Sequence, residues 1–169
     1  MAPELFWIPG PWRGRLAISS RPRGGDWLED EVRAWQRANL DVVVSLLERE
    51  EQRELGLEEE GPLVEAAGLR FVSFPIPDLG VPASRTLAAF LVQEFSRDLE
   101  SGRNVAVHCR QGVGRSGLIA AGALIVAGMD AASALRTVSA ARGLNVPETP
   151  EQRAWIERLA PDRPALARR

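Results

Sequence analysis

One segment, NVAVHCRQGVGRSGLIAAGALIVAG at residues 104–128, limits the possible folds more than any other part of the sequence. It predicts a short buried strand over 104–108, a loop with two glycines, and a helix over 115–127. The helix is apolar on all sides, so it needs protein on every face. A strand followed closely by a buried helix is typical of a protein in which helices cover a central sheet.

Other apolar segments extend this pattern. Residues 41–47, DVVVSLL, form an apolar run that favours a strand buried on both faces. Further strands are predicted at 5–8, 15–19 and 69–76, and the prolines of FPIPDLGVP end the last of these. Helices are predicted at 26–38 with Asp26 as the cap, from Ser84 to Leu99, at 131–142 and at 150–159. The expected fold is therefore α/β, with a central mixed, largely parallel sheet flanked by helices.

The length of 169 residues suits one domain, which we expect over residues 1–160. The last residues, 161–169, are expected to form a flexible tail. The charged segment EREEQRELGLEEEG at 48–61 is predicted to be a solvated helix and loop. No stretch is long and apolar enough to cross a bilayer, and the first residues do not resemble a signal peptide.

The composition excludes several functions. A net charge of -2 gives no general attraction to nucleic acid or to an anionic membrane. The chain has one Cys, so it cannot form an intramolecular disulfide, and a reducing compartment such as the cytoplasm is expected. All 21 basic residues are Arg, and Tyr is absent, which excludes a lysine Schiff base and a tyrosine-lined pocket.

The loop between the predicted strand and the buried helix suits an anion. Backbone N–H groups converge there, and the helix N-terminus adds roughly half a positive charge. Gly112 and Gly114 allow backbone conformations that a side chain would block. Arg115 can bind two phosphoryl oxygens through its planar guanidinium. The same positive environment favours the thiolate form of Cys109, which is the nucleophilic form.

The residues HCRQGVGRSG resemble the H-C-x5-R-[S/T] signature of cysteine-dependent protein tyrosine and dual-specificity phosphatases, with His108, Cys109, Arg115 and Ser116 at the fixed positions. The resemblance covers most of the chain, from the strand at 42–47 to the last helix. It implies hydrolysis of a phosphoprotein through a phosphocysteine, without a cofactor or a metal ion.

The resemblance also assigns roles to residues. Cys109 would be the nucleophile, and the hydroxyl of Ser116 would donate to its thiolate. His108 would hold the loop backbone through hydrogen bonds of its ring. The residues expected to bind the phosphate are Arg110, Gln111, Gly112, Val113, Gly114 and Arg115.

Relatives protonate the leaving oxygen with an Asp on a mobile upstream loop, and Asp78 in FPIPDLGVP occupies that place. A simple turn residue after Pro77 is the alternative interpretation of Asp78. Relatives also pair the loop arginine with an acidic residue, for which Glu48 and Glu51 are candidates. However, both belong to a run of charged residues, and the side chains of such a run are expected to be exposed to solvent. Gln152 resembles a water-positioning glutamine of larger relatives, but a helix cap with Thr149 is the favoured role.

The length suits the compact dual-specificity branch, whose shallow pocket would accept phosphotyrosine, with phosphoserine and phosphothreonine as further candidates. The expected partner is a phosphorylated protein or peptide, without nucleic acid or membrane, and we expect a monomer. Inorganic phosphate or sulfate should also fit the loop. Phosphoinositide and RNA 5′-triphosphate hydrolysis are the alternatives, but only Arg110 could meet extra phosphates, and the net charge disfavours RNA. A phosphopeptide-binding module would be expected to have lost Cys109, Arg115 or Asp78.

Overall fold

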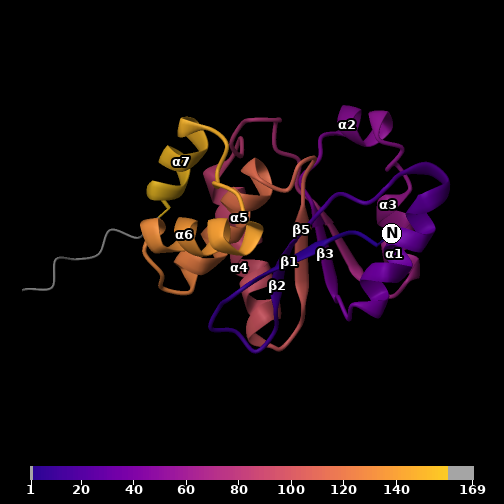
Figure 1. Cartoon of the computed structure of the whole chain (residues 1–169), viewed down its shortest axis with the longest axis horizontal. Helices are drawn as coiled ribbons and strands as arrows, with labels where there is room; N and C mark the ends of the chain where they lie inside the picture. The colour runs from indigo at the N-terminus through magenta and orange to yellow at the C-terminus, as the bar shows by residue number, and fades with distance from the viewer. Residues whose placement is uncertain (1, 160–169) are drawn as a thin grey trace, which may run out of the picture.

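The computed structural model describes residues 2–159, so the tail predicted at 161–169 lies outside the described residues. Within this range, five strands form one sheet in the order β1-β2-β5-β3-β4 (Figure 1). Their bounds are Leu5–Ile8 for β1, Leu16–Ser19 for β2, Val42–Ser45 for β3, Arg70–Ser73 for β4 and Val105–His108 for β5. β1 runs antiparallel to β2, and the other neighbouring strands are parallel, which confirms the mixed, largely parallel sheet.

Helices lie on both faces of the sheet (Figure 1). α1 and α3 lie on one face, while α4, α5, α6 and α7 lie on the other. The bounds are Leu28–Arg37 for α1, Arg49–Glu54 for α2, Glu60–Ala66 for α3, Arg85–Glu100 for α4, Gly114–Val126 for α5, Ala131–Arg142 for α6 and Pro150–Glu157 for α7.

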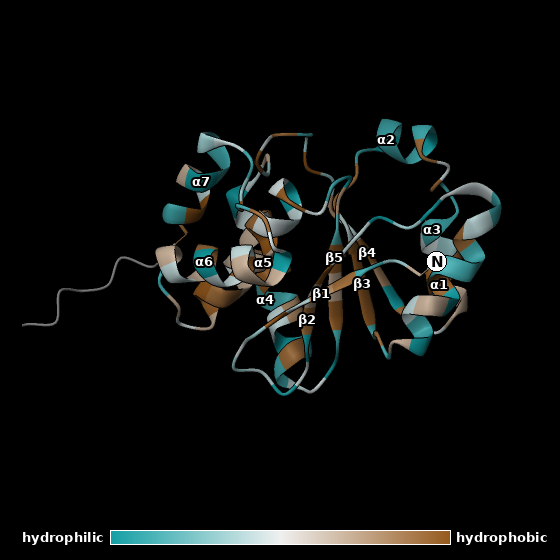
Figure 2. Ribbon diagram, in the orientation of Figure 1, coloured by the Kyte–Doolittle hydropathy of each residue, from teal (hydrophilic) through white to brown (hydrophobic). Residues whose placement is uncertain are grey.

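Each face of the sheet has its own apolar core. Successive strand residues point to opposite faces, so Val44 and Val107 pack toward α4 and α5, while Val43 and Ala106 pack toward α1. Figure 2 shows hydrophobic residues concentrated along the strands, between the two helical layers. The central strands β3 and β5 are buried at every residue, as their apolar sequences predict.

The buried helix α5 follows β5 after a short loop, as predicted, and every residue from Gly114 to Ile125 is buried. This arrangement directs the N-terminus of α5 toward the carboxyl end of the sheet. The loop after β5 and the short helix α2 lie at this same edge (Figure 1). In open α/β sheets, this edge is where ligands usually bind.

The predicted helix cap at Asp26 is wrong. Gly25–Trp27 forms a 3₁₀ turn, η1, and α1 begins at Leu28 without a side-chain cap from Trp27. The cause is tertiary: the Gly25 N–H donates to the Gly56 carbonyl at 2.9 Å, with Gly25 in a left-handed conformation at φ 59°. The loop after α2 therefore sets the entry into α1. Within residues 2–159, no helix is both long and apolar enough to cross a membrane.

Candidate active site

The loop between β5 and α5 carries a buried cysteine at its start. Cys109 is 2% exposed, and its Sγ accepts a hydrogen bond from the Gly112 N–H at 3.2 Å. Gly112 has a φ of 68°, and a Cβ there would lie 3.3 Å from Ile18 Cγ2 and 3.4 Å from the Ser19 carbonyl. Glycine is therefore required at this position for the N–H to face the sulfur. A backbone donor and the N-terminus of α5 both place positive partial charge beside the sulfur.

Arg115 lies in the first turn of α5, and its guanidinium is buried and fixed from two directions. Its Nη1 and Nη2 donate to the two oxygens of Glu51 at 2.6 and 2.8 Å. Nη1 also donates to the Ile76 carbonyl at 3.0 Å. This bidentate contact fixes both the position and the plane of the guanidinium.

The prediction that Glu51 is solvated is wrong. Glu51 is buried at the third position of α2, and its carboxylate also accepts a hydrogen bond from the Glu48 N–H at 3.0 Å. The three-residue spacing from Glu48 to Glu51 is that of a capping box, which turns the second side chain back toward the helix start. That spacing was the available sequence signal, but it does not identify Arg115 as the partner.

The Glu51–Arg115 pair is stably ionised. Burial alone would raise the pKa of Glu51, but the hydrogen bonds from Arg115 and from the Glu48 N–H outweigh it and lower the pKa below its ordinary value. Burial likewise would lower the pKa of Arg115, but the hydrogen bond to Glu51 and the nearby Cys109 raise it. Both groups therefore keep their charges at neutral pH.

Glu51→Gln should lower the free energy of unfolding at pH 7 by up to about 3 kcal/mol, because the buried Arg115 would keep only the half-exposed Asp78 as a counter-charge. Since the folded-state pKa of Glu51 is lowered, its stabilising effect is present above its unfolded pKa and is lost as the pH falls through the folded value. Urea unfolding of both proteins from pH 7 downward measures this. The difference between them should shrink in acid, and a constant difference would contradict the assignment.

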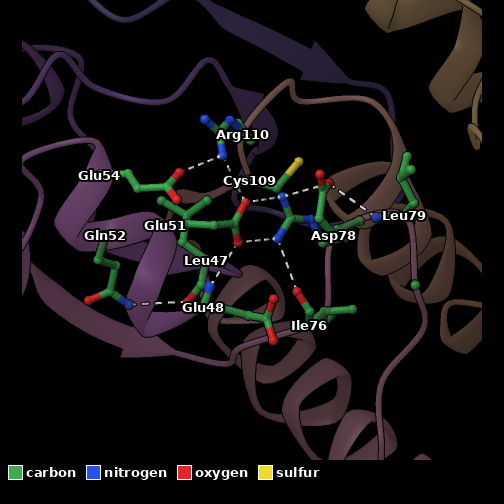
Figure 3. A network of polar contacts seen from close by, with 12 residues as sticks. Leu47, Glu48, Glu51, Gln52, Glu54, Ile76, Asp78, Leu79, Cys109 and Arg110 are labelled. Carbon is green, nitrogen blue, oxygen red and sulfur yellow. Dashed lines mark hydrogen bonds and ion pairs between the residues drawn. The ribbon is translucent and has the colours of Figure 1, made fainter.

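Asp78 approaches the same guanidinium from the other side. Its Oδ1 lies 3.1 Å from Arg115 Nη2, while its side chain is 52% exposed. The same oxygen accepts a hydrogen bond from the Leu79 N–H at 3.0 Å, and Leu79 has a φ of 60° (Figure 3). The structure thus brings Asp78, Arg115 and Cys109 to one place, with Asp78 on a loop that is open to solvent.

Gln152 links this loop to α7. The predicted capping role is confirmed, because the Gln152 N–H donates to Thr149 Oγ1 at 3.1 Å and the Thr149 N–H donates to Gln152 Oε1 at 3.3 Å. Its Nε2 also donates to the Gly80 carbonyl at 3.0 Å. Gln152 therefore anchors the loop of Asp78 as well as the start of α7.

His108 lies beneath the loop and is fully buried. Its Nδ1 is 3.4 Å from the Cys109 carbonyl oxygen, and its Nε2 is 2.6 Å from Glu60 Oε1. Glu60, the first residue of α3, is buried, although its segment is predicted to be solvated. These contacts fix the imidazole ring against the loop backbone, the kind of support that the family resemblance implies for His108.

The remaining predicted residues lie around the loop in different environments. Ser116 Oγ is buried and has no hydrogen-bond partner among the described residues, so it is not bonded to Cys109 here. Arg110 extends toward α2, Gln111 is exposed and Val113 is partly buried. A Cβ on Gly114 would lie 2.4 Å from Glu148 Oε2, so a side chain there would have to move the Glu148 carboxylate.

Arg142, in the last turn of α6, also contacts the loop, and the sequence did not predict this contact. Its Nε donates to the Gly112 carbonyl at 2.8 Å and its Nη2 donates to the Gln111 carbonyl at 3.2 Å. Its guanidinium lies over the Phe6 ring, 4.1 Å from the centroid. By holding these carbonyls, Arg142 favours the loop conformation in which the Gly112 N–H faces the Cys109 sulfur. An arginine near the C-terminal end of a helix usually binds the last carbonyls of that helix, so the sequence carries no signal for this contact.

Arg142→Met should weaken binding of inorganic phosphate by about tenfold, because it removes two hydrogen bonds that order the loop. Calorimetric titration with phosphate measures this. Arg136→Met is the matched control, since Arg136 lies on the same helix and donates to Ser133. Equal phosphate affinity in the Arg142 variant and the wild type would show that the loop is ordered without this contact.

Comparison with known proteins agrees with this geometry. Residues 18–129 match the family model described as "Tc-R-P: Polymorphic toxin system, DSP-PTPase phosphatase". No curated protein sequence matches the chain.

Among solved structures, kinase-associated phosphatase with its catalytic-site cysteine replaced by serine has a TM-score of 0.84 at 17% identity, covering 92% of this chain and 93% of that one. Tk-PTP in the active form has a TM-score of 0.72 at 28% identity, covering 87% and 92%. PTPMT1 in complex with PI(5)P has a TM-score of 0.73 at 20% identity, covering 91% and 94%.

Proposed function

The chain belongs to the DSP-PTPase phosphatase family of polymorphic toxin systems, and we propose that it hydrolyses phosphotyrosine in proteins or peptides, with phosphoserine and phosphothreonine as further substrates, through a phosphocysteine at Cys109. One observation carries the proposal. The Cys109 sulfur accepts a backbone N–H beside the start of a buried helix, within the same site as an arginine that a buried carboxylate orients. This combination suits a thiolate nucleophile facing a phosphoryl group.

In the first step, the substrate phosphate binds the inward N–H groups of the loop and the guanidinium of Arg115. Glu51 engages both terminal nitrogens of that guanidinium, so the edge formed by Nε and Nη2 is the one suited to two phosphoryl oxygens. A phosphate there would displace the Asp78 carboxylate from Nη2, and the exposed carboxyl group would take up a proton from solvent before the bond breaks. The sulfur–phosphorus bond forms as the bond from phosphorus to the leaving oxygen breaks, and that oxygen takes the proton of Asp78.

In the second step, water attacks the phosphocysteine, with Asp78 accepting its proton. The sulfur–phosphorus bond breaks, and inorganic phosphate and the Cys109 thiolate are released. The Ser116 hydroxyl, which has no hydrogen-bond partner among the described residues, would donate to the departing sulfur. Arg115 and the backbone N–H groups supply the positive charge on the transferring phosphoryl group, so we expect turnover to persist in EDTA.

Asp78→Asn should lower kcat by roughly 10²- to 10⁴-fold for a tyrosyl leaving group, because an amide cannot donate the proton that the leaving oxygen needs. Phenyl phosphates with acidic phenols should lose much less, since their oxygens leave without protonation. Steady-state kinetics across a leaving-group series measures this. An equal loss for every phenol would give Asp78 a structural role, as in a simple turn after Pro77.

The substrate class can be tested directly with the purified protein. We expect phosphate release from a phosphotyrosine peptide to exceed that from phosphoserine and phosphothreonine peptides, from PI(5)P in vesicles and from RNA with a 5′-triphosphate. The phosphoinositide alternative is kept because the structurally similar PTPMT1 binds PI(5)P. Faster hydrolysis of the lipid would favour that alternative. Peptide binding without turnover would favour a binding module instead.

The location of the protein follows from the same chemistry. A free thiolate needs reducing conditions, which supports a cytoplasmic location.

A further inference from the structure

We propose that the site selects substrates with a single phosphate and disfavours a second phosphate beside the first, through the ion pair of Arg110 with Glu54. This inference rests on the proposed function and specifies the substrates of the same site. Arg110 directly follows the nucleophile and is the only other arginine of the loop besides Arg115. Among the side chains of the loop itself, a second phosphate next to the bound one would therefore depend on Arg110 for a cation, since Arg142 is held by the loop carbonyls.

That side chain is already engaged by α2. Arg110 Nη1 lies 3.3 Å from Glu54 Oε2 and 3.9 Å from Glu51 Oε1, at the rim of the site (Figure 3). The Arg110 side chain is 37% exposed and that of Glu54 is 62% exposed, so the pair lies where a substrate would pass. A second phosphate would have to displace Glu54 and then remain close to its free carboxylate.

The surrounding charges oppose a second anion. Residues 48–60 contain seven glutamates and two arginines, and Arg53 is itself near Glu50 and Glu58 at 3.8 and 4.0 Å. On the other side of the loop, Glu148 Oε2 lies near Gly114. The charges at the rim therefore favour a substrate whose only negative group near the loop is the phosphate being removed.

The expected size of the discrimination follows from Coulomb's law at a solvated surface. Two unit charges a few ångströms apart in water interact strongly enough to change an equilibrium constant about fivefold. A phosphate carries nearly two negative charges, so its repulsion by a carboxylate is larger. We therefore expect wild-type kcat/KM to be about tenfold lower for a doubly phosphorylated peptide than for its singly phosphorylated form.

The experiment uses two peptides of one sequence, one with phosphotyrosine alone and one with an added phosphothreonine two residues before it. Glu54→Gln should raise the relative kcat/KM for the doubly phosphorylated peptide about fivefold while leaving the other nearly unchanged. Glu58→Gln is the matched control, because it removes the same charge from the same segment but lies near Arg53. Adding Arg110→Gln to the Glu54 variant should remove the gain in relative kcat/KM for the doubly phosphorylated peptide.

Three results would overturn the inference while leaving the proposed function intact. In the first, the wild type hydrolyses both peptides equally well. In the second, Glu54→Gln leaves the ratio of the two kcat/KM values unchanged. In the third, the ratio changes equally in the Glu58 variant. Failure of the wild type to hydrolyse either peptide would overturn the proposed function and the inference together.

Discussion

Cys109→Ser is expected to lower kcat for phosphotyrosine peptides by at least about 10⁴-fold. A serine hydroxyl is not ionised at neutral pH, and the N–H of Gly112 and the start of α5 would not convert it into a comparable nucleophile. Sensitive detection of released phosphate under single-turnover conditions measures the loss.

Phosphate binding is the control for the Cys109 variant. The loop N–H groups and Arg115 do not depend on the sulfur, so calorimetric affinity for inorganic phosphate should stay within a few-fold of the wild type. Activity within about tenfold of the wild type would rule out the cysteine as nucleophile. Loss of both activity and phosphate binding would instead point to a distorted loop.

Arg115→Lys is expected to lower kcat/KM by about 10³- to 10⁵-fold, nearly as much as Arg115→Ala. A lysine ammonium restores the positive charge opposite Glu51, but it cannot present two parallel N–H groups to the phosphoryl oxygens. It also cannot keep the three hydrogen bonds to Glu51 and the Ile76 carbonyl. Geometry, not charge alone, is the property under test.

Stability measurements separate the two Arg115 variants. Arg115→Ala leaves the buried Glu51 with only the more distant Arg110 as a counter-charge, so part of its loss of activity could come from unfolding. Arg115→Lys keeps a cation there and should keep a urea midpoint closer to the wild type. Near-normal turnover in a folded Lys variant would show that the planar guanidinium is not what the reaction needs.

The sequence predicted those parts of the fold that depend on local pattern. The apolar runs that became β3, β5 and α5 are continuous over a few residues, and burial follows directly from their composition. The glycine loop, Cys109 and Arg115 are close in the sequence, so their chemistry could be inferred from their spacing. Asp78 required the family resemblance, because nothing in the sequence alone brings its loop to Arg115.

The groups that orient the site could not be predicted because their partners are distant in the sequence. Glu51 lies 64 residues from Arg115, and Glu60 lies 48 residues from His108. Both glutamates belong to a charged segment that would normally be solvated, and each is buried only because a cation or an imidazole meets it in the fold. Arg142 reaches the loop from the far end of α6. Local patterns contain no information about such pairs.

The most direct test of the phosphocysteine mechanism is rapid chemical quenching of Ser116→Ala with a ³²P-labelled phosphotyrosine peptide. Without the serine hydroxyl, release of the thiolate should slow, so the phosphorylated enzyme should accumulate before phosphate appears. The mechanism predicts label on the peptide fragment that contains Cys109, formed at the rate of the first step, and no label in Cys109→Ser. Steady release of phosphate with no labelled enzyme at any quench time, or label on another residue, would contradict it.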